Sequence, residues 1–213
     1  MRRPFSLYRM KRNRLEILYR VVGVGTQALS RARVGDSLDV LGPLGTRFER
    51  PAGKQKFLVV GGGVGVPPLV LWVEALLKEG VPASEIFVFL GFRSRNVVIC
   101  ERDFKKMGVS VRVATDDGTA GRRGIVTDLL KTFLKEEPFA PVTTQATVCG
   151  PWRMMSAAAE ICKREKLACQ ASLEQHMGCA LGACLGCVVE TSRGFERVCT
   201  EGPVMDAAEV RWT

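Results

Sequence analysis

Short apolar runs alternate with helical segments over the middle of the chain. The runs cover residues 57–60, 86–90, 109–114, 147–149 and 168–173. Strands buried inside a parallel sheet have this continuous apolar character, and the helices between them cover the two faces of the sheet. The pattern therefore predicts a parallel α/β domain over residues 53–170.

The best-defined helix follows the first of these strands. Pro67 and Pro68 suit its opening turn, where the N–H that proline lacks is not needed. Gly80 follows the expected end of the helix. One apolar stripe marks its buried face: Leu69, Trp72, Val73, Leu76 and Leu77. A second helix is expected from Pro151 to about Lys166.

The segments on either side of this domain have a different pattern of apolar and polar residues. Before it, β-rich stretches at residues 15–22 and 38–41 are punctuated by glycines, which predicts antiparallel strands joined by turns. Beyond Leu173 the chain becomes rich in Gly and Cys and loses its periodicity. We therefore expect three regions, over residues 1–52, 53–170 and 171–213.

Composition places the chain among globular proteins. Of its 213 residues, 46% are hydrophobic and 25% are charged, which is unlike a disordered or collagenous chain. The apolar runs fall far short of the roughly 20 residues that a membrane span requires. The Arg-rich start is not followed by an apolar segment, so it lacks the pattern of a secretory signal. We expect a cytoplasmic protein.

The formal net charge of +9 is concentrated at the start of the chain. Residues 1–33 carry nine Lys or Arg against the single acid Glu16, which leaves a local charge of 9 − 1 = +8. Such a surplus can bind the phosphates of a cofactor or an acidic partner, and a solvated basic hairpin explains it equally well. Binding of nucleic acid is the non-enzyme alternative, and a strongly salt-dependent gel shift would support it. We expect no nucleic-acid partner.

Four of the eight cysteines crowd together, with the spacing Cys179-x4-Cys184-x2-Cys187-x11-Cys199. This is the plant-type ligand spacing of a [2Fe–2S] cluster, whereas zinc modules usually pair their ligands as two Cys-x2-Cys units. The glycines and alanines between the cysteines let a loop wrap closely around a cluster and direct its amides at sulfur. We predict a [2Fe–2S] cluster, and a zinc-holding module is the alternative.

Two glycine turns each close a strand and open a helix. The first holds Gly61, Gly62, Gly63 and Gly65, and the second is Cys149-Gly150-Pro151. Backbone without side chains lets a pyrophosphate approach the positive end of a helix. Packing alone also explains many glycines in α/β connections. Two such turns at the carboxyl ends of parallel strands predict a nucleotide-binding crevice.

Three groups of motifs follow one another between Arg3 and Asp206. The first is Arg3-Pro4-Phe5-Ser6 with Leu18-Tyr19-Arg20 and Gly25-Thr26, the second is the pair of glycine turns, and the third is Ser172-Leu173-Glu174 with the four cysteines and Val198-Cys199-Thr200-Glu201-Gly202-Pro203. This combination resembles the ferredoxin reductase-like flavoproteins. Among them it is most similar to the iron–sulfur electron transfer subunits of NAD-linked dihydroorotate dehydrogenase.

The resemblance implies an α/β fold with a partial antiparallel β-barrel, a parallel-sheet nucleotide domain and a C-terminal cluster module. It implies that the first group binds FAD, with Arg3 and the Gly25–Thr26 turn at the pyrophosphate and Ser6 facing the isoalloxazine. Residues 42–45 would continue this site, and the glycine turns would bind NAD. Members of the family carry further strands before the Arg-Pro-x-Ser motif, so we expect this chain by itself to bind FAD poorly.

The resemblance also implies a function. Electrons would pass from an FMN-containing dihydroorotate dehydrogenase catalytic subunit through the [2Fe–2S] cluster and FAD to NAD+, in the biosynthesis of pyrimidines such as UMP. A heterotetramer with two copies of each subunit is expected, and diaphorase activity with NADH. The alternatives of the same fold are the NAD-binding subunit of an anaerobic sulfite reductase and the flavin subunit of an NADPH and ferredoxin transhydrogenase.

Overall fold

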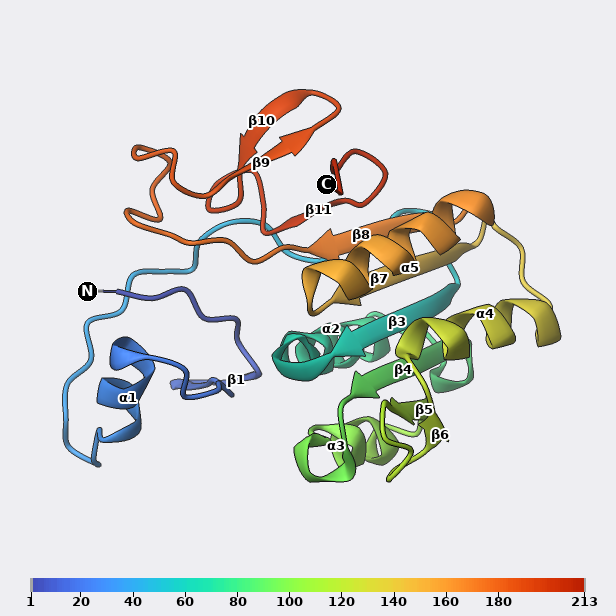
Figure 1. The fold of residues 1–213 in the computed structure, drawn as a ribbon, viewed down its shortest axis with the longest axis horizontal. Coiled ribbons are helices and arrows are strands. Elements are labelled where there is room, and N and C mark those ends of the chain that lie inside the picture. Colours follow the sequence, from blue (N-terminus) through green and yellow to red (C-terminus); the bar gives the residue numbers. More distant parts are fainter. Residues whose placement is uncertain (1, 213) are drawn as a thin grey trace.

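A seven-stranded sheet forms the centre of the computed structural model, which describes residues 2–212 (Figure 1). Its strands in spatial order are β11 (Val204–Asp206), β8 (Ala168–Ser172), β7 (Thr144–Cys149), β3 (Lys56–Gly62), β4 (Ile86–Phe92), β5 (Ser110–Thr115) and β6 (Arg122–Arg123). Every neighbouring pair is parallel except β11 and β8. All five apolar runs therefore form strands, as predicted.

Helices cover both faces of this sheet. Successive side chains of a strand point to opposite faces, so each strand contributes to both cores. Phe57 and Val59 of β3 share one core with α2 (Val66–Lys78) and α3 (Glu101–Lys106). Leu58 and Val60 share the other core with α4 (Val126–Glu136) and α5 (Trp152–Arg164). The two helices expected from sequence are present as α2 and α5. Within residues 2–212, no helix is both long and apolar enough to cross a membrane.

The N-terminal region forms much less regular structure than the sequence predicts. It holds a hairpin of β1 (Arg9–Lys11) and β2 (Arg14–Glu16) and a short helix, α1 (Val24–Ser30). The predicted strand at residues 15–22 stops at Glu16, and residues 38–41 form no strand. These segments lack a neighbouring strand to accept their backbone hydrogen bonds, which a strand requires. The barrel is thus represented by one hairpin, and no side chain of residues 2–47 is buried.

The β1–β2 hairpin is attached to the nucleotide domain through polar contacts. The Tyr8 hydroxyl donates to Asp103 at 2.8 Å, and Arg9 Nη2 donates to the same carboxylate at 2.6 Å. Arg9 also lies 3.8 Å from Glu74 of α2. Because Asp103 belongs to α3, the hairpin rests against both helices on this face of the sheet.

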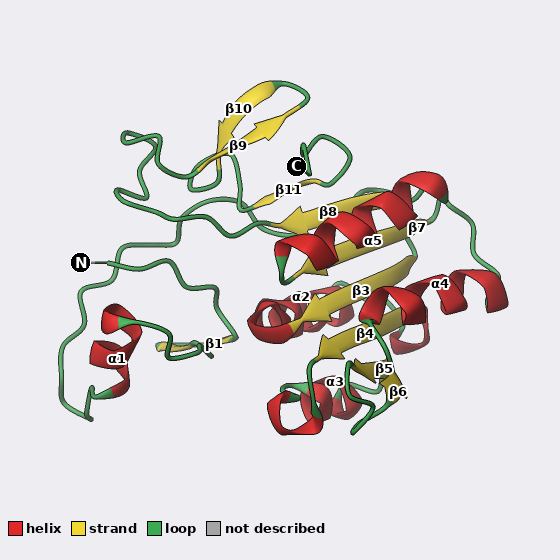
Figure 2. Cartoon of the chain, in the orientation of Figure 1, coloured by secondary structure: helices red, strands yellow, loops and turns green. Residues whose placement is uncertain are grey.

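The C-terminal region begins and ends at the central sheet. A long loop, shown green in Figure 2, leaves β8 and leads to a hairpin of β9 (Val188–Thr191) and β10 (Gly194–Arg197). The chain then returns as β11 beside β8, and Leu173 donates its N–H to the Pro203 carbonyl at 2.8 Å. The cysteine loop is therefore tied to the nucleotide domain at both of its ends.

Candidate functional site

The β9–β10 hairpin brings two of the four cysteines together. Cys187 immediately precedes β9 and Cys199 follows β10 by two residues. The Val198 N–H donates to the Cys187 carbonyl at 3.1 Å, and the two thiols share a hydrogen bond. Both side chains are buried, and burial raises the pKa of Cys199. These two cysteines form the inner pair.

Cys179 and Cys184 form an outer pair nearer the solvent. The backbone N–H groups of Leu181 and Cys184 each donate to Cys179 Sγ at 3.4 Å. Hydrogen bonds to a thiolate stabilise its charged form, so these amides lower the pKa of Cys179 to about 6. Cys184 is exposed. Cys179 is thus already held by two backbone donors that favour a thiolate ligand.

The arrangement in two pairs fits a two-iron cluster. Such a cluster takes four thiolates, two for each iron. The loop reaches this shape with backbone that glycine favours: Gly182 has φ +79°, and a Cβ there would lie 3.1 Å from Thr200. The donor set therefore suits a [2Fe–2S] cluster.

The two glycine turns pack directly against each other. A Cβ at Gly65 would lie 2.5 Å from the Gly150 backbone, and one at Gly62 would collide with the Met154 sulfur. Gly61, Gly62 and Gly65 are buried, while Gly63, Gly150 and Pro151 reach the surface. Packing therefore requires several of these glycines, and the same packing brings both turns together at the carboxyl ends of β3 and β7.

The start of α2 offers fewer anion-binding groups than most helix starts. Pro67 and Pro68 occupy its first turn and have no N–H. The Val66 N–H already donates to the Gly63 carbonyl. A pyrophosphate in the predicted crevice would therefore depend more on the backbone of the glycine turns than on the first turn of the helix.

Cys149 lies at the end of β7, where it faces the start of the cysteine loop. It pairs in register with Ser172 of β8, whose side chain hydrogen-bonds to it. Complete burial is the main cause that raises the pKa of the Cys149 thiol to about 12; the Ser172 hydrogen bond lowers this pKa, and the charge of Glu174 raises it. The thiol is thus neutral at physiological pH. Ser172-Leu173-Glu174 begins beside Cys149 and leads directly into the cysteine loop.

The structure brings together members of the predicted flavin-binding group. The Arg3 side chain crosses Gly25, where a Cβ would lie 3.2 Å from Nε. Phe5 and Tyr19 pack edge to face with ring centroids 5.6 Å apart. The Thr26 hydroxyl caps the start of α1, since it accepts from the Val22 and Gly23 amides. The other members lie in irregular chain before and after the hairpin: Pro4, Ser6, Leu18 and Arg20.

The predicted flavin-binding region also touches the cysteine region. Gly45 has φ +71° and packs so closely on Gly202 that a Cβ would lie 2.5 Å from the Gly202 carbonyl oxygen. The Thr46 N–H donates to that oxygen at 2.6 Å, and the Thr46 hydroxyl donates to the Val204 carbonyl at 2.9 Å. Residues 42–45 therefore lie next to the segment that follows Cys199.

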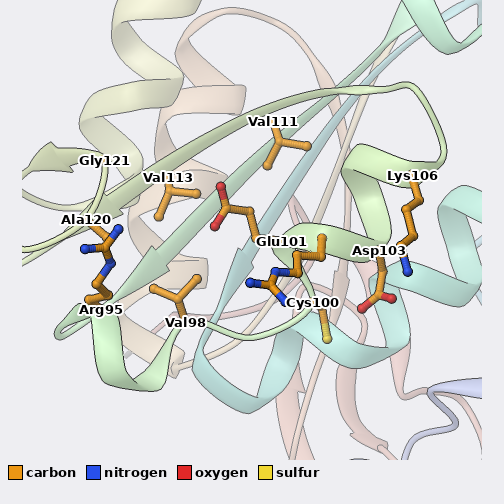
Figure 3. A pocket seen from close by; sticks show the side chains of 11 residues that line it. Arg95, Val98, Cys100, Glu101, Asp103, Lys106, Val111, Val113, Ala120 and Gly121 are labelled. Carbon is orange, nitrogen blue, oxygen red and sulfur yellow. The ribbon is translucent and has the colours of Figure 1, made fainter.

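A separate cavity of about 820 Å³ lies near the other edge of the sheet (Figure 3). Arg95 and Glu101 line it, between α3, β5 and the turn at Ala120 and Gly121. It contains none of the predicted site residues. In the same turn, Asp117 accepts from the Thr119 N–H and hydroxyl at 3.0 and 2.7 Å. Asp117 therefore stabilises the turn.

Sequence analysis missed several residues that shape the site. Arg197 and Glu201 lie beneath the cysteine loop, and their spacing of four residues around Cys199 could have indicated an ion pair. Asp103 holds the N-terminal hairpin from 94 residues away. No local pattern in the sequence indicates such a contact.

Comparisons with known proteins agree with this geometry. Residues 59–160 match the family model of the oxidoreductase NAD-binding domain, and residues 174–211 match that of the iron–sulfur cluster binding domain of dihydroorotate dehydrogenase B. These matches confirm the prediction that the chain binds NAD and an iron–sulfur cluster.

Relatives that match nearly the whole chain are also named after dihydroorotate dehydrogenase B. The chain is 36% identical over 218 residues to the dihydroorotate dehydrogenase B (NAD(+)) electron transfer subunit of Desulforamulus reducens, covering 100% of this chain and 80% of the relative. It is 39% identical over 217 residues to the subunit of the same name from a Geobacillus species, covering 99% and 80%.

A solved structure supports the predicted fold. It is an NADH-dependent reduced ferredoxin-NADP oxidoreductase studied for flavin-based electron bifurcation, with a TM-score of 0.84 and 30% identity, covering 98% of this chain and 74% of that one. The cytochrome b5 reductase domain of Ulva prolifera nitrate reductase shares the fold at 19% identity and a TM-score of 0.52. On its identity to the full-length relatives, the chain belongs to the family of dihydroorotate dehydrogenase B (NAD(+)) electron transfer subunits.

Proposed function

We propose that this chain transfers electrons between a dihydroorotate dehydrogenase catalytic subunit and NAD+. One observation carries the proposal. The end of β8 lies beside Cys149 of the second glycine turn and leads into the loop whose four cysteines form two pairs. The names of the relatives support the substrate and the partner. We further propose that the catalytic subunit carries FMN, that two copies of each subunit assemble, and that the complex is cytoplasmic, where thiols stay reduced.

Each region of the chain would hold one redox group. Cys179, Cys184, Cys187 and Cys199 would ligate the cluster, and the Arg3 to Thr26 group would bind FAD. When bound, the cluster exchanges single electrons with the flavin, which can accept them singly and donate two at once to a nicotinamide. The contact of Gly45 with Gly202 links the regions assigned to these two groups.

The protein's own residues have three tasks in this scheme. The backbone of the glycine turns and Pro151 shape the crevice for the nicotinamide dinucleotide. The buried thiol of Cys149 stays neutral, so it adds no negative charge beside the bound nucleotide. The amides of Leu181 and Cys184 stabilise negative charge on Cys179.

Substitution of one cluster ligand tests the proposal. With FAD bound, the variant Cys184→Ser should lose electron transfer to and from the catalytic subunit but keep NADH-to-dye diaphorase activity, because the dye takes electrons without the cluster. Cys100→Ser, which removes a thiol outside the cysteine loop, should keep both activities. Unchanged turnover of Cys184→Ser with the catalytic subunit would contradict the proposal.

A second candidate function rests on the likeness to the electron-bifurcating oxidoreductase. In that case the chain would exchange electrons with ferredoxin and not with a dihydroorotate-oxidising subunit. Supplying each partner to the same preparation separates the two functions. Dihydroorotate-dependent reduction of NAD+ with the catalytic subunit supports the first, and NADH formation with reduced ferredoxin alone supports the second.

A further inference from the structure

An ion pair lies directly beneath the cysteine loop. Arg197 is the last residue of β10, and its Nε donates to Glu201 Oε2 at 2.9 Å. Its Nη2 contacts the other oxygen of the same carboxylate, so the pair is bidentate. The Arg197 backbone N–H also donates to Glu201 at 2.8 Å. Such a planar, two-point contact fixes the orientation of the guanidinium.

The pair joins two distant parts of the loop. The remaining Arg197 nitrogen, Nη1, donates to the Gly182 carbonyl at 3.2 Å, and Gly182 lies between the two outer cysteines. On the other side, the backbone N–H groups of Thr200, Glu201 and Gly202 all donate to the Arg197 carbonyl. The Thr200 hydroxyl donates to Glu201 at 3.0 Å. Arg197 thus connects the outer pair's loop to the turn that carries Cys199.

The same ion pair flanks one cysteine of the inner pair. Arg197 precedes Cys199 by two residues and Glu201 follows it by two, so a positive and a negative group lie on either side of this cysteine along the chain. A cluster with four thiolates is negative and becomes more negative when it is reduced. A nearby cation favours that reduction, and a nearby anion opposes it.

We propose that Arg197 and Glu201 are positioning residues that fix the cysteine loop and set the reduction potential of the cluster in opposite directions. The inference rests on the proposed function, since it takes the four cysteines as cluster ligands. The side chains of Arg197 and Glu201 are only partly exposed, at 38% and 33%. Solvent therefore screens their effect on the cluster only in part.

Two charge-neutralising variants test the proposal. Arg197→Gln removes the cation and leaves Glu201, so the midpoint potential should shift to a more negative value. Glu201→Gln keeps the shape and frees the cation, so the potential should shift to a more positive value. The measurement is a redox titration of the complete protein, followed by the paramagnetic signal of the reduced cluster. NADH-to-dye activity should stay unchanged in both variants.

The chain offers a matched control on the same hairpin. Arg193 pairs with Glu196 and Glu209 at 3.0 Å in each case, so Arg193→Gln removes one positive charge together with two ion pairs. The midpoint potential of the cluster in Arg193→Gln should stay at the wild-type value. If Arg197→Gln and Glu201→Gln shift the potential in the same direction, or by no more than Arg193→Gln does, the proposal is wrong.

A failure to assemble the cluster is also informative. Arg197→Lys keeps the positive charge but loses the planar guanidinium that contacts both Gly182 and Glu201. The content of iron and sulfide per chain should therefore be lower than in Arg193→Gln. Full loading of Arg197→Lys would overturn the positioning role. If the wild-type protein itself holds no iron–sulfur cluster, the proposed function fails, and this outcome is distinct from a loaded protein with unshifted variants.

Discussion

Burial separates the Cys149 thiol from the cysteines of the cluster loop. Because its pKa is raised to about 12, this thiol ionises only as the pH approaches that value. At pH 8 its thiolate fraction is about a thousandfold below that of an unperturbed thiol. We predict that iodoacetamide at pH 8 leaves Cys149 unmodified in the native protein and modifies it in urea.

Peptide mass spectrometry measures this outcome directly. Modification of native Cys149 at the rate of a small free thiol would show that the nucleotide crevice is open and polar around it. The prediction also bears on mechanism, because a neutral thiol can contact a nicotinamide without adding charge.

Gly65 illustrates how one residue fixes the contact between the two glycine turns. Its missing side chain lets the backbones of the two turns meet, and a Cβ would lie 2.5 Å from Gly150. Overpacking of this kind costs about 1–3 kcal/mol. Gly65→Ala should therefore lower the free energy of unfolding by that amount and raise the KM for NADH.

Gly23→Ala is the matched control for this substitution. Gly23 has extended backbone, and a Cβ there would meet nothing within 4 Å. Its free energy of unfolding should change by less than about 0.5 kcal/mol. Equal stability and equal KM for the two variants would mean that the turns do not pack as described.

Among the elements, the β1–β2 hairpin is joined to α3 through one carboxylate. Asp103 accepts from both Tyr8 and Arg9 and is only 19% exposed. Hydrogen bonds to charged groups are worth about 1.5–3 kcal/mol, so Asp103→Asn should raise the population of released hairpin roughly tenfold or more. Limited trypsin digestion should then cleave faster at Lys11 and Arg12.

A surface ion pair in the same region provides the comparison. Arg2 and Asp39 are 57% and 73% exposed, and exposed pairs contribute little. Asp39→Asn should leave the cleavage rate unchanged. If Asp103→Asn behaves in the same way, the hairpin is held by contacts other than Asp103.

The elements that sequence analysis predicted well are those whose burial is continuous. Residues 57–60 and 86–90 form strands because both faces of the sheet are covered, which makes every position apolar. The stretch at residues 17–22 has equally high β-propensity but no partner strand, and it stays irregular. Propensity alone does not form a strand, since the backbone groups must also find hydrogen-bond partners.

The site likewise divides into a part that local sequence predicts and a part that depends on contacts between distant residues. The spacing of Cys179 to Cys199 reflects local chemistry, so the cluster loop could be predicted. The contact of Gly45 with Gly202 and the packing of Gly65 on Gly150 join residues far apart in the sequence. Such contacts depend on the assembled sheet and leave no local pattern.

At the scale of the whole molecule, stability is unevenly distributed. The nucleotide domain and the C-terminal hairpin share continuous cores, whereas Phe48 is the first buried side chain along the described chain. The predicted flavin-binding group thus lies in the least buried part. This supports the expectation that the chain alone binds FAD weakly, and substoichiometric flavin after gel filtration would agree with it.

The proposed function requires one chain to connect a nicotinamide site to an iron–sulfur cluster. An anaerobic titration with NADH tests this connection in the protein loaded with iron, sulfide and FAD, in the absence of the catalytic subunit. NADH should bleach the cluster and produce its paramagnetic signal. If dithionite reduces the cluster but NADH leaves it oxidised while FAD is bound, the two sites are not connected.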